Sequence, residues 1–171
     1  MSLIVETGAG LSNAESYISV ANADIYNTAY VGNALWANTA TTTAMKEVAL
    51  RVATQYIDAK YSFKGYKSIQ GQALAWPRAD AYDDSDYLLS STSIPECLKR
   101  AVVEAAIRHI AGDLLLGVQD KPGAIASESI KVGPIEKSVS YVAGRSQAKA
   151  YPKITGLLKS ITSSLEEMKR S

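Results

Sequence analysis

The sequence has little of the chemistry on which metal sites and disulfide frameworks depend. Its 171 residues include one cysteine, Cys97, and one histidine, His109. A single cysteine excludes an intramolecular disulfide and a thiolate metal cluster, and a single histidine excludes a histidine-rich metal site. We therefore expect a protein that has no metal or other cofactor.

Long hydrophobic runs and an amino-terminal basic region are also absent. The strongest apolar stretch, residues 114–118, is far shorter than the roughly 20 residues that cross a bilayer. No lysine or arginine precedes Lys46, so the sequence gives no support for a secretory signal. We expect a reducing cytoplasm and no membrane contact. The length favours a single domain over residues 1–171, with an extended amino-terminal segment and a carboxyl-terminal helix and tail.

The charges nearly cancel in total but are distributed unevenly. Eighteen basic and seventeen acidic residues give a net charge of +1, divided into blocks of −3 (residues 1–44), +4 (45–78), −5 (79–96), +1 (97–113) and +4 (114–171). Such blocks can give different faces opposite potentials that guide copies of a chain together. Alternatively, they are solvated charges that mix when the chain folds.

The spacing of apolar residues predicts a mainly α-helical protein. We expect helices over about 20–30, 43–61, 94–116 and 151–165, the first capped by Ser19 and ended by Gly32, and the third begun by a cap at Ser93. The third is the longest and most apolar, so it should form the core. In the second helix, the residues expected to face the core are Met45, Val48, Val52, Tyr56 and Ile57.

Two other segments have patterns that are not helical. Residues 79–93 read as a polar loop. Residues 129–132 and 135–141 alternate apolar and polar side chains around Gly133-Pro134, which predicts a β-ribbon. A two-stranded ribbon is marginally stable alone, so it must lean on helices or on another subunit. The predicted fold is a small bundle of about four helices with a short β-hairpin.

No arrangement of residues predicts catalysis. Cys97 lies in the first turn of the third helix, where the helix dipole could lower the pKa of its thiol. We interpret it instead as a small, partly buried residue. His109 lies twelve residues further on, about 18 Å along the same helix, which is too far for a catalytic pair. We interpret His109 as a structural or surface residue and expect a protein that is not an enzyme.

The acidic loop and the early glycines do not form a known ligand motif. Asp80, Asp83, Asp84 and Asp86 lack the turn glycine and distant glutamate of a calcium loop. They favour a solvated loop or a surface that faces a partner. Gly8-Ala9-Gly10 lacks the glycine pattern of a nucleotide site.

Aromatic and basic residues interleave in one short span, which contains Tyr56, Lys60, Tyr61, Phe63, Lys64, Tyr66 and Lys67. Aromatic faces can stack on bases while lysines hold the phosphate backbone. Tyr56, however, belongs to the apolar face of its helix, and a net charge of +1 is not the strongly basic footprint of an independent DNA binder. Packing in the core or between subunits is the alternative.

Six short segments occur in an order that resembles one known family. They are residues 2–8 (SLIVETG), 14–21 (AESYISVA), 53–58 (ATQYID), 72–78 (QALAWPR), 94–95 (IP) and 131–136 (KVGPIE). This order resembles that of head-to-tail connector, or adaptor, proteins of tailed bacteriophages. Members of that family are often labelled DnaT-like single-stranded-DNA-binding proteins.

The resemblance implies a structural virion protein. Such a subunit forms a homo-oligomeric ring, commonly of twelve copies, that binds the portal and joins the capsid to a downstream neck or tail protein. Genomic double-stranded DNA would pass through the channel without sequence-specific contacts. The expected location is the neck of the virion, reached from the host cytoplasm during assembly. The alternative is a DnaT-like binder of single-stranded DNA that acts in replication.

Three sets of residues follow from these readings. The residues expected at the subunit interface are Ile130, Val132, Ile135, Asp83, Asp84 and Asp86. Those expected to dock onto the portal or neck are Leu157, Leu158, Ile161, Lys169 and Arg170. Those expected to face DNA are Lys60, Lys64 and Lys67, which the alternative reading uses with their aromatic neighbours.

Overall fold

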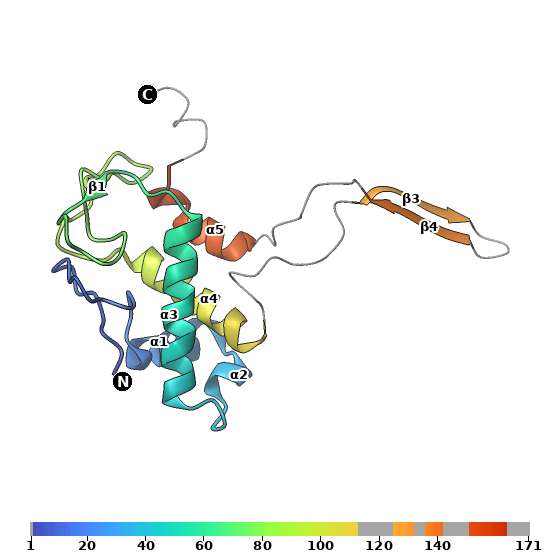
Figure 1. The fold of residues 1–171 in the computed structure, drawn as a ribbon, viewed down its shortest axis with the longest axis horizontal. Helices are drawn as coiled ribbons and strands as arrows, with labels where there is room; N and C mark the ends of the chain where they lie inside the picture. Colours follow the sequence, from blue (N-terminus) through green and yellow to red (C-terminus); the bar gives the residue numbers. More distant parts are fainter. Residues whose placement is uncertain (1, 113–124, 132–135, 142–150, 164–171) are drawn as a thin grey trace. The chain divides into compact units, whose positions relative to one another are not determined.

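The computed structural model describes residues 2–112, 125–131, 136–141 and 151–163. It divides into unit 1, Met1–Leu115 with Pro152–Ser171, and unit 2, Leu116–Tyr151. Unit 1 contains the elements α1 (Val20–Tyr26), η1 (Asn27–Val31), α2 (Ala34–Ala37), α3 (Thr43–Lys60), β1 (Tyr66–Lys67), β2 (Arg78–Ala79), α4 (Glu96–Ile110), α5 (Pro152–Leu158) and η2 (Lys159–Ile161) (Figure 1). Unit 2 contains β3 (Ile125–Lys131) and β4 (Glu136–Tyr141). The predicted class, a helical bundle with a short hairpin, is confirmed.

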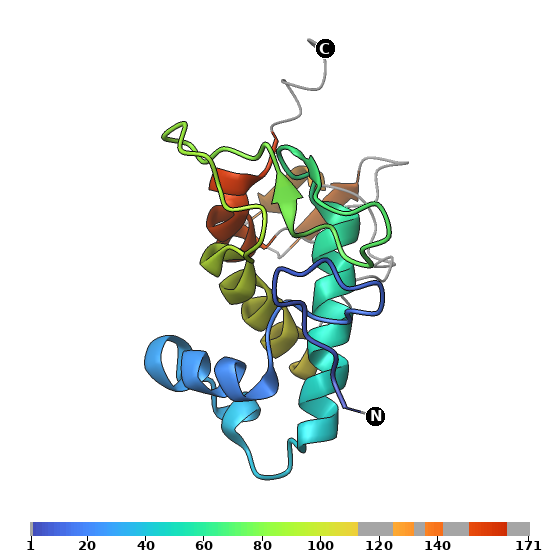
Figure 2. The same cartoon turned by 90° about the vertical axis from the view of Figure 1, so that its left-hand side faces the viewer.

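Helix α4 lies at the centre of unit 1, as its apolar sequence predicts. It packs against α3 and α5 and also contacts α1 and α2 (Figure 2). Every residue from Ala101 to Ile107 is buried. Three of these residues are alanines, whose small side chains let neighbouring helices approach closely.

Both predicted ends of α4 need correction. The residue before the helix is Pro95, which makes no side-chain capping bond, so the predicted cap at Ser93 is wrong. The helix ends at Ile110 rather than near residue 116. Gly112 adopts φ +89° and donates its N–H to the carbonyl of His109 at 3.0 Å, which closes the last turn.

Helix α3 ends one residue before its predicted end and buries Tyr56 and Ile57 as predicted, but its first half turns a different face to the core. Met45 and Val48 are each 50% exposed, so their predicted core positions are wrong. The buried face consists of Ala49, Leu50, Ala53, Thr54, Tyr56 and Ile57. Both stripes are apolar, and the smaller residues of the second one allow closer packing against α4.

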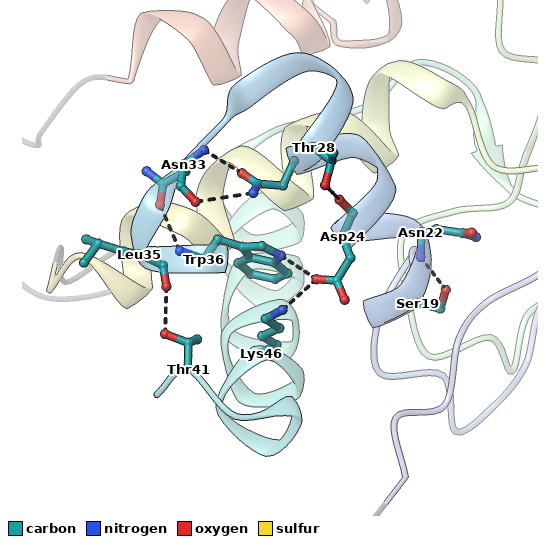
Figure 3. A network of polar contacts seen from close by, with 10 residues as sticks. Ser19, Asn22, Asp24, Thr28, Asn33, Leu35, Trp36, Thr41 and Lys46 are labelled. Atoms are coloured by element: carbon teal, nitrogen blue, oxygen red, sulfur yellow. Dashed lines mark hydrogen bonds and ion pairs between the residues drawn. The ribbon is translucent and has the colours of Figure 1, made fainter. Parts of the chain in front are cut away.

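A polar network joins α1, α2 and α3 around the buried Trp36 (Figure 3). The carboxylate of Asp24 accepts bonds from Trp36 Nε1 and from Lys46 Nζ, each at 2.7 Å. Asn33 caps α2 by accepting from the N–H of Trp36 at 3.0 Å, and its own N–H donates to Asn27 Oδ1. The four-residue helix α2, which the sequence does not predict, is thereby fixed to its neighbours.

The first helix begins as predicted and then changes its winding. Ser19 accepts the N–H of Asn22 at 3.2 Å, which confirms the cap. After Tyr26 the chain continues as a π-helix over Asn27–Val31, and Gly32 ends it in the left-handed conformation. The predicted helix therefore consists of two differently wound segments.

The amino-terminal segment is ordered by the buried carboxylate of Glu6. This carboxylate accepts the backbone N–H groups of Gly8, Gly10 and Leu11 at 2.7 to 2.9 Å. The carbonyl of Leu11 in turn accepts the N–H of Ala73 at 3.0 Å. The turn therefore docks onto the long loop between α3 and α4.

Unit 2 is the predicted antiparallel ribbon. Its register pairs Lys131 with Glu136 and Ser129 with Ser138, and β3 begins four residues earlier than predicted. Within the described ranges, none of the helices combines the length and the hydrophobicity that crossing a membrane requires.

Candidate nucleic-acid interface

A groove on unit 1 combines two lysines, one tyrosine and four hydroxyl side chains. It has a volume of about 320 Å³, and the residues that line it are Lys60, Tyr61, Ser62, Thr155, Lys159, Thr162 and Ser163. None of the lining residues that the structure describes carries a carboxylate. Lysine ammonium groups and serine or threonine hydroxyls are common donors to phosphate oxygens, so the groove is suited to a nucleic-acid backbone.

Backbone hydrogen bonds hold the two walls of the groove together. The N–H of Ser163 donates to the carbonyl of Ser62 at 2.9 Å, and the N–H of Lys64 donates to the carbonyl of Ile161 at 3.1 Å. Phe63 forms an antiparallel bridge with the residue between these two, Thr162. The end of α3 and the end of η2 therefore lie side by side, about one hundred residues apart in sequence.

Lys60 lies over two aromatic rings at the edge of this groove. Its Nζ is 5.1 Å from the ring centre of Tyr56 and 5.9 Å from that of Tyr61, and it donates to the Tyr56 hydroxyl at 2.7 Å. Burial raises the pKa of Tyr56, so its hydroxyl stays neutral and accepts this bond. Tyr61 also bonds through its hydroxyl to Thr155 at 2.9 Å.

The other predicted DNA-facing residues have different environments. Lys64 forms an ion pair with Asp84 at 3.2 Å and donates to the carbonyl of Ser160. Lys67 donates to the carbonyl of Gln72 at 3.3 Å. Of the three predicted lysines, only Lys60 lines the groove.

The aromatic residues of the predicted cluster are also separated by the fold. Phe63 is buried and packs edge-on against Trp76, with ring centres 6.0 Å apart. Tyr56 is buried as well, as the packing alternative predicts. Tyr66 is exposed, and Tyr61 lines the groove.

Tyr17 and Asp58 form a buried pair that fixes the loop between β1 and β2. The Tyr17 hydroxyl lies 2.7 and 2.9 Å from the two carboxylate oxygens of Asp58, to which it donates, and it accepts the N–H of Trp76 at 3.1 Å. Asp58 also accepts the N–H of Ala75 at 2.9 Å. Burial raises the pKa of Asp58, although both donors oppose the shift, and burial likewise raises the pKa of Tyr17. The peptide bond between Trp76 and Pro77 is cis.

Arg78 also fixes this loop, by bonding it to the residues just before β1. Its guanidinium donates to the carbonyls of Lys64 at 2.6 Å, Ala75 at 3.3 Å and Gly65. Burial lowers the pKa of Arg78. The side chain thus acts as a cross-link between backbone segments.

The acidic loop is organised by local bonds. Asp83 accepts the N–H groups of Ser85 and Tyr87 at 2.8 and 3.0 Å, and Asp84 pairs with Lys64. Asp86 has a left-handed φ of +61°. Nowhere in the described ranges do three or more histidine, cysteine or acidic side chains gather as metal ligands would.

Some of the remaining predicted site residues lie inside the described ranges and others lie outside them. Ile130 pairs with Lys137 in the hairpin, whereas Val132, Ile135, Lys169 and Arg170 lie outside the described residues. Leu157 is partly accessible. Leu158 and Ile161 are buried, because α5 and η2 turn them toward the core, and they are not presented for docking.

The isolated cysteine and histidine have ordinary structural surroundings. Cys97 is partly buried, as expected, and burial raises the pKa of its thiol, which argues against a lowering by the helix dipole. His109 is partly exposed and lines an apolar groove with Met45, Val48 and Ile110.

Five residues of the groove were not predicted as site residues. One is Ser62, which directly follows Tyr61. The other four lie on α5, η2 and the residues after them, and the sequence shows only that they are polar: Thr155, Lys159, Thr162 and Ser163. Their role depends on the pairing of Phe63 with Thr162, which no local pattern reveals.

Comparison with known proteins identifies a family for this chain. No curated protein and no solved structure matches the chain significantly. The model of a family described as "Putative DnaT-like ssDNA binding protein" matches residues 1–171. The prediction of a virion connector that binds a portal and forms a ring is corrected by this match, which agrees instead with the stated alternative. The chain belongs to this family of "Putative DnaT-like ssDNA binding protein".

Proposed function

We propose that the chain binds single-stranded DNA, with the groove of Lys60, Tyr61 and Lys159 holding its backbone. The observation that carries the proposal is the composition of this groove, whose described lining residues have two ammonium groups, four serine or threonine hydroxyls and no carboxylate. The whole-chain family match supports the same ligand class.

The groove has the two kinds of contact that binding without sequence preference requires. Lys60 and Lys159 attract phosphates. The Ser62 hydroxyl can donate to a phosphate oxygen, and so can that of Thr155 when Tyr61 donates to it, whereas the Ser163 hydroxyl already donates to the carbonyl of Ser62 at 3.2 Å. The ring of Tyr61 provides an aromatic face for an unpaired base. We further propose that this role is binding without catalysis, acting in DNA replication.

Lys159→Gln tests the role of the groove, with Lys67→Gln as the matched control. Each variant removes one positive charge from an exposed lysine, but only Lys159 lines the groove. One phosphate contact to single-stranded DNA contributes a salt slope of about 0.7, or roughly a five-fold loss of affinity at 0.1 M salt when it is removed. Lys67 bonds to the carbonyl of Gln72, so the control variant should bind nearly as tightly as the wild type.

The measurement is the fluorescence anisotropy of a labelled single-stranded oligonucleotide titrated with the full chain. Equal losses in the two variants would indicate general electrostatic attraction and contradict the role of the groove. An absence of binding by the wild type at low salt would contradict the proposed function itself.

A further inference from the structure

A second cavity on unit 1 combines aromatic rings with basic side chains. It has a volume of about 230 Å³ and lies between the α1–η1 segment and the first turns of α4, which contact each other in the core. The lining residues are Ile18, Asn22, Ile25, Tyr26, Tyr30, Glu96, Lys99 and Arg100. Pockets for drug-sized ligands are usually roughly 300–1,000 Å³, so this cavity suits a smaller, single ring system.

The apolar wall of the cavity is unusually exposed. Tyr30 is 67% exposed and Ile25 is 66% exposed. The ring of Tyr30 lies 5.3 Å from that of Tyr26 at an angle of 31°, so the more buried ring supports the outer one. An exposed aromatic ring beside a cavity offers a flat face to a ligand, and its position here has no role in the core.

The winding of the chain places Tyr30 in this position. It lies in the π-helix Asn27–Val31, which follows α1 and ends at Gly32. A π-helical segment rotates the following side chains relative to a regular α-helix, and such segments occur frequently at functional sites. Asn33, which belongs to the polar network of Figure 3, donates its N–H to Asn27 Oδ1 at 3.0 Å and so holds this segment in place.

The basic wall matches an anionic ligand that carries a ring. The Arg100 guanidinium lies 5.2 Å from the ring centre of Tyr30 and 6.0 Å from that of Tyr26. Lys99 and Arg100 pair with the exposed Glu96 at 3.5 and 3.7 Å. Exposed pairs of this kind are weak, so a phosphate can compete with the carboxylate.

We infer that this cavity is a base-stacking subsite for single-stranded DNA, in which an unpaired base stacks on Tyr30 while Lys99 and Arg100 contact the adjacent phosphate. The inference rests on the proposed function. The amide of Asn22, which lines the cavity, has both a donor and an acceptor for a base edge. An adjoining cavity of about 290 Å³ shares Ile18, Asn22 and Lys99, which leaves room for the next nucleotide.

The subsite would account for a preference for single strands. Lysines and hydroxyls contact phosphates in both single- and double-stranded DNA, whereas stacking on an exposed ring requires a base that is free of its partner. The groove of Lys60 and Lys159 would supply most of the affinity, and the cavity of Tyr30 would add to the selectivity that stacking on Tyr61 provides.

The test compares two labelled ligands of about 12 phosphates, an oligothymidylate and an abasic strand of the same charge, by fluorescence anisotropy with the full chain. Tyr30→Ala should weaken binding of the oligothymidylate by roughly ten-fold or more and leave binding of the abasic strand unchanged. Tyr30→Phe, which keeps the ring, should retain the wild-type preference. Tyr87→Ala is the matched control, because Tyr87 is 72% exposed, lies between β2 and α4 and is not one of the residues that line the cavity.

Glu96→Gln provides a test of opposite sign. Removing this carboxylate frees Lys99 and Arg100, so we expect tighter binding of both strands at low salt. Two results would overturn the subsite. One is a ratio of oligothymidylate affinity to abasic-strand affinity that is as large in Tyr30→Ala as in the wild type, and the other is equal affinity of the wild type for both strands. If those results appear while Lys159→Gln still weakens binding, the proposed function stands without it. Failure of the wild type to bind either strand would overturn both.

Discussion

Tyr17→Phe is the perturbation that most directly tests the buried arrangement behind the groove. The Tyr17 side chain is 1% exposed, and its hydroxyl joins the Asp58 carboxylate to the N–H of Trp76. Phenylalanine fills the same space without the hydroxyl. The variant therefore leaves the N–H of Trp76 buried without an acceptor and removes one donor from a largely buried carboxylate.

The expected cost follows from these two losses. A buried, unsatisfied N–H costs about 1–3 kcal/mol, and a hydrogen bond to a charged group contributes about 1.5–3 kcal/mol. We expect the free energy of unfolding to fall by about 3–5 kcal/mol. At about 2–4 °C per kcal/mol for a chain of this size, Tm should fall by roughly 6–20 °C.

The loss should also depend on pH. Burial raises the pKa of Asp58 in the folded chain, and the Tyr17 hydroxyl opposes that rise by stabilising the carboxylate. Tyr17→Phe should therefore raise the pKa of Asp58 further. An acid whose pKa is higher in the folded than in the unfolded state stabilises the fold fully below its unfolded pKa, here near 3.8. That stabilisation is lost as the pH increases through the folded pKa. The difference between variant and wild type should be smaller at acid pH than at pH 7.

The assay is urea denaturation followed by tryptophan fluorescence, because Trp36 and Trp76 are both buried. Tyr87→Phe is the matched control, since it removes the same hydroxyl from an exposed side chain. A Tyr17→Phe variant that unfolds within about 0.5 kcal/mol of this control would refute the reasoning.

Three further predictions concern other parts of unit 1. Gly8→Ala should destabilise the fold by several kcal/mol in thermal unfolding, because φ is +106° and a Cβ would lie 2.0 Å from the Thr92 carbonyl oxygen, whereas Gly71→Ala, with open space around it, should be nearly neutral. Cys97 should react with a thiol reagent at pH 8 more slowly than free cysteine and at the free rate only in urea, since burial raises its pKa; equal rates in the folded chain would contradict this. Burial raises the pKa of Tyr26 to about 12 from 10.0, so the stability that this shift contributes is present below pH 10 and should be lost as the pH rises toward 12. Urea titrations at pH 9 and pH 11 should show a smaller loss of stability for Tyr26→Phe than for the wild type.

Much of the helical fold could be predicted because its signals are local. Helix α3 begins after the capping residue Thr42, whose hydroxyl accepts the N–H of Met45, and its apolar spacing continues to Ile57. The hairpin follows from alternation around Gly133-Pro134. In both cases the pattern extends over enough residues to specify the element.

The orientation of those elements could not be predicted in the same way. Helix α3 carries two apolar stripes, and contact with α4, not hydrophobicity, selects the one with Ala49 and Ala53 over the one with Met45 and Val48. Helix α2 has only four residues, too few for a periodic signal, and depends on bonds from Asn33 and Asp24.

The charge blocks show how folding changes the meaning of a sequence pattern. Lys46 pairs with Asp24, and Lys64 pairs with Asp84. Arg51 likewise pairs with Glu15 at 3.0 Å. These contacts join blocks of opposite sign within one chain, as the alternative of mixed charges predicts. Part of the basic block is therefore neutralised, and the groove depends on lysines from two separate blocks.

The most direct test of the central claim is the salt dependence of oligonucleotide binding by the full chain and by the double variant Lys60→Gln/Lys159→Gln. Single-stranded binding through the groove predicts that log K falls linearly with log[salt] and that the slope decreases by about 1.4 in the variant, since each lost phosphate contact removes about 0.7. An unchanged slope, or no salt-dependent binding by the wild type, would contradict the account.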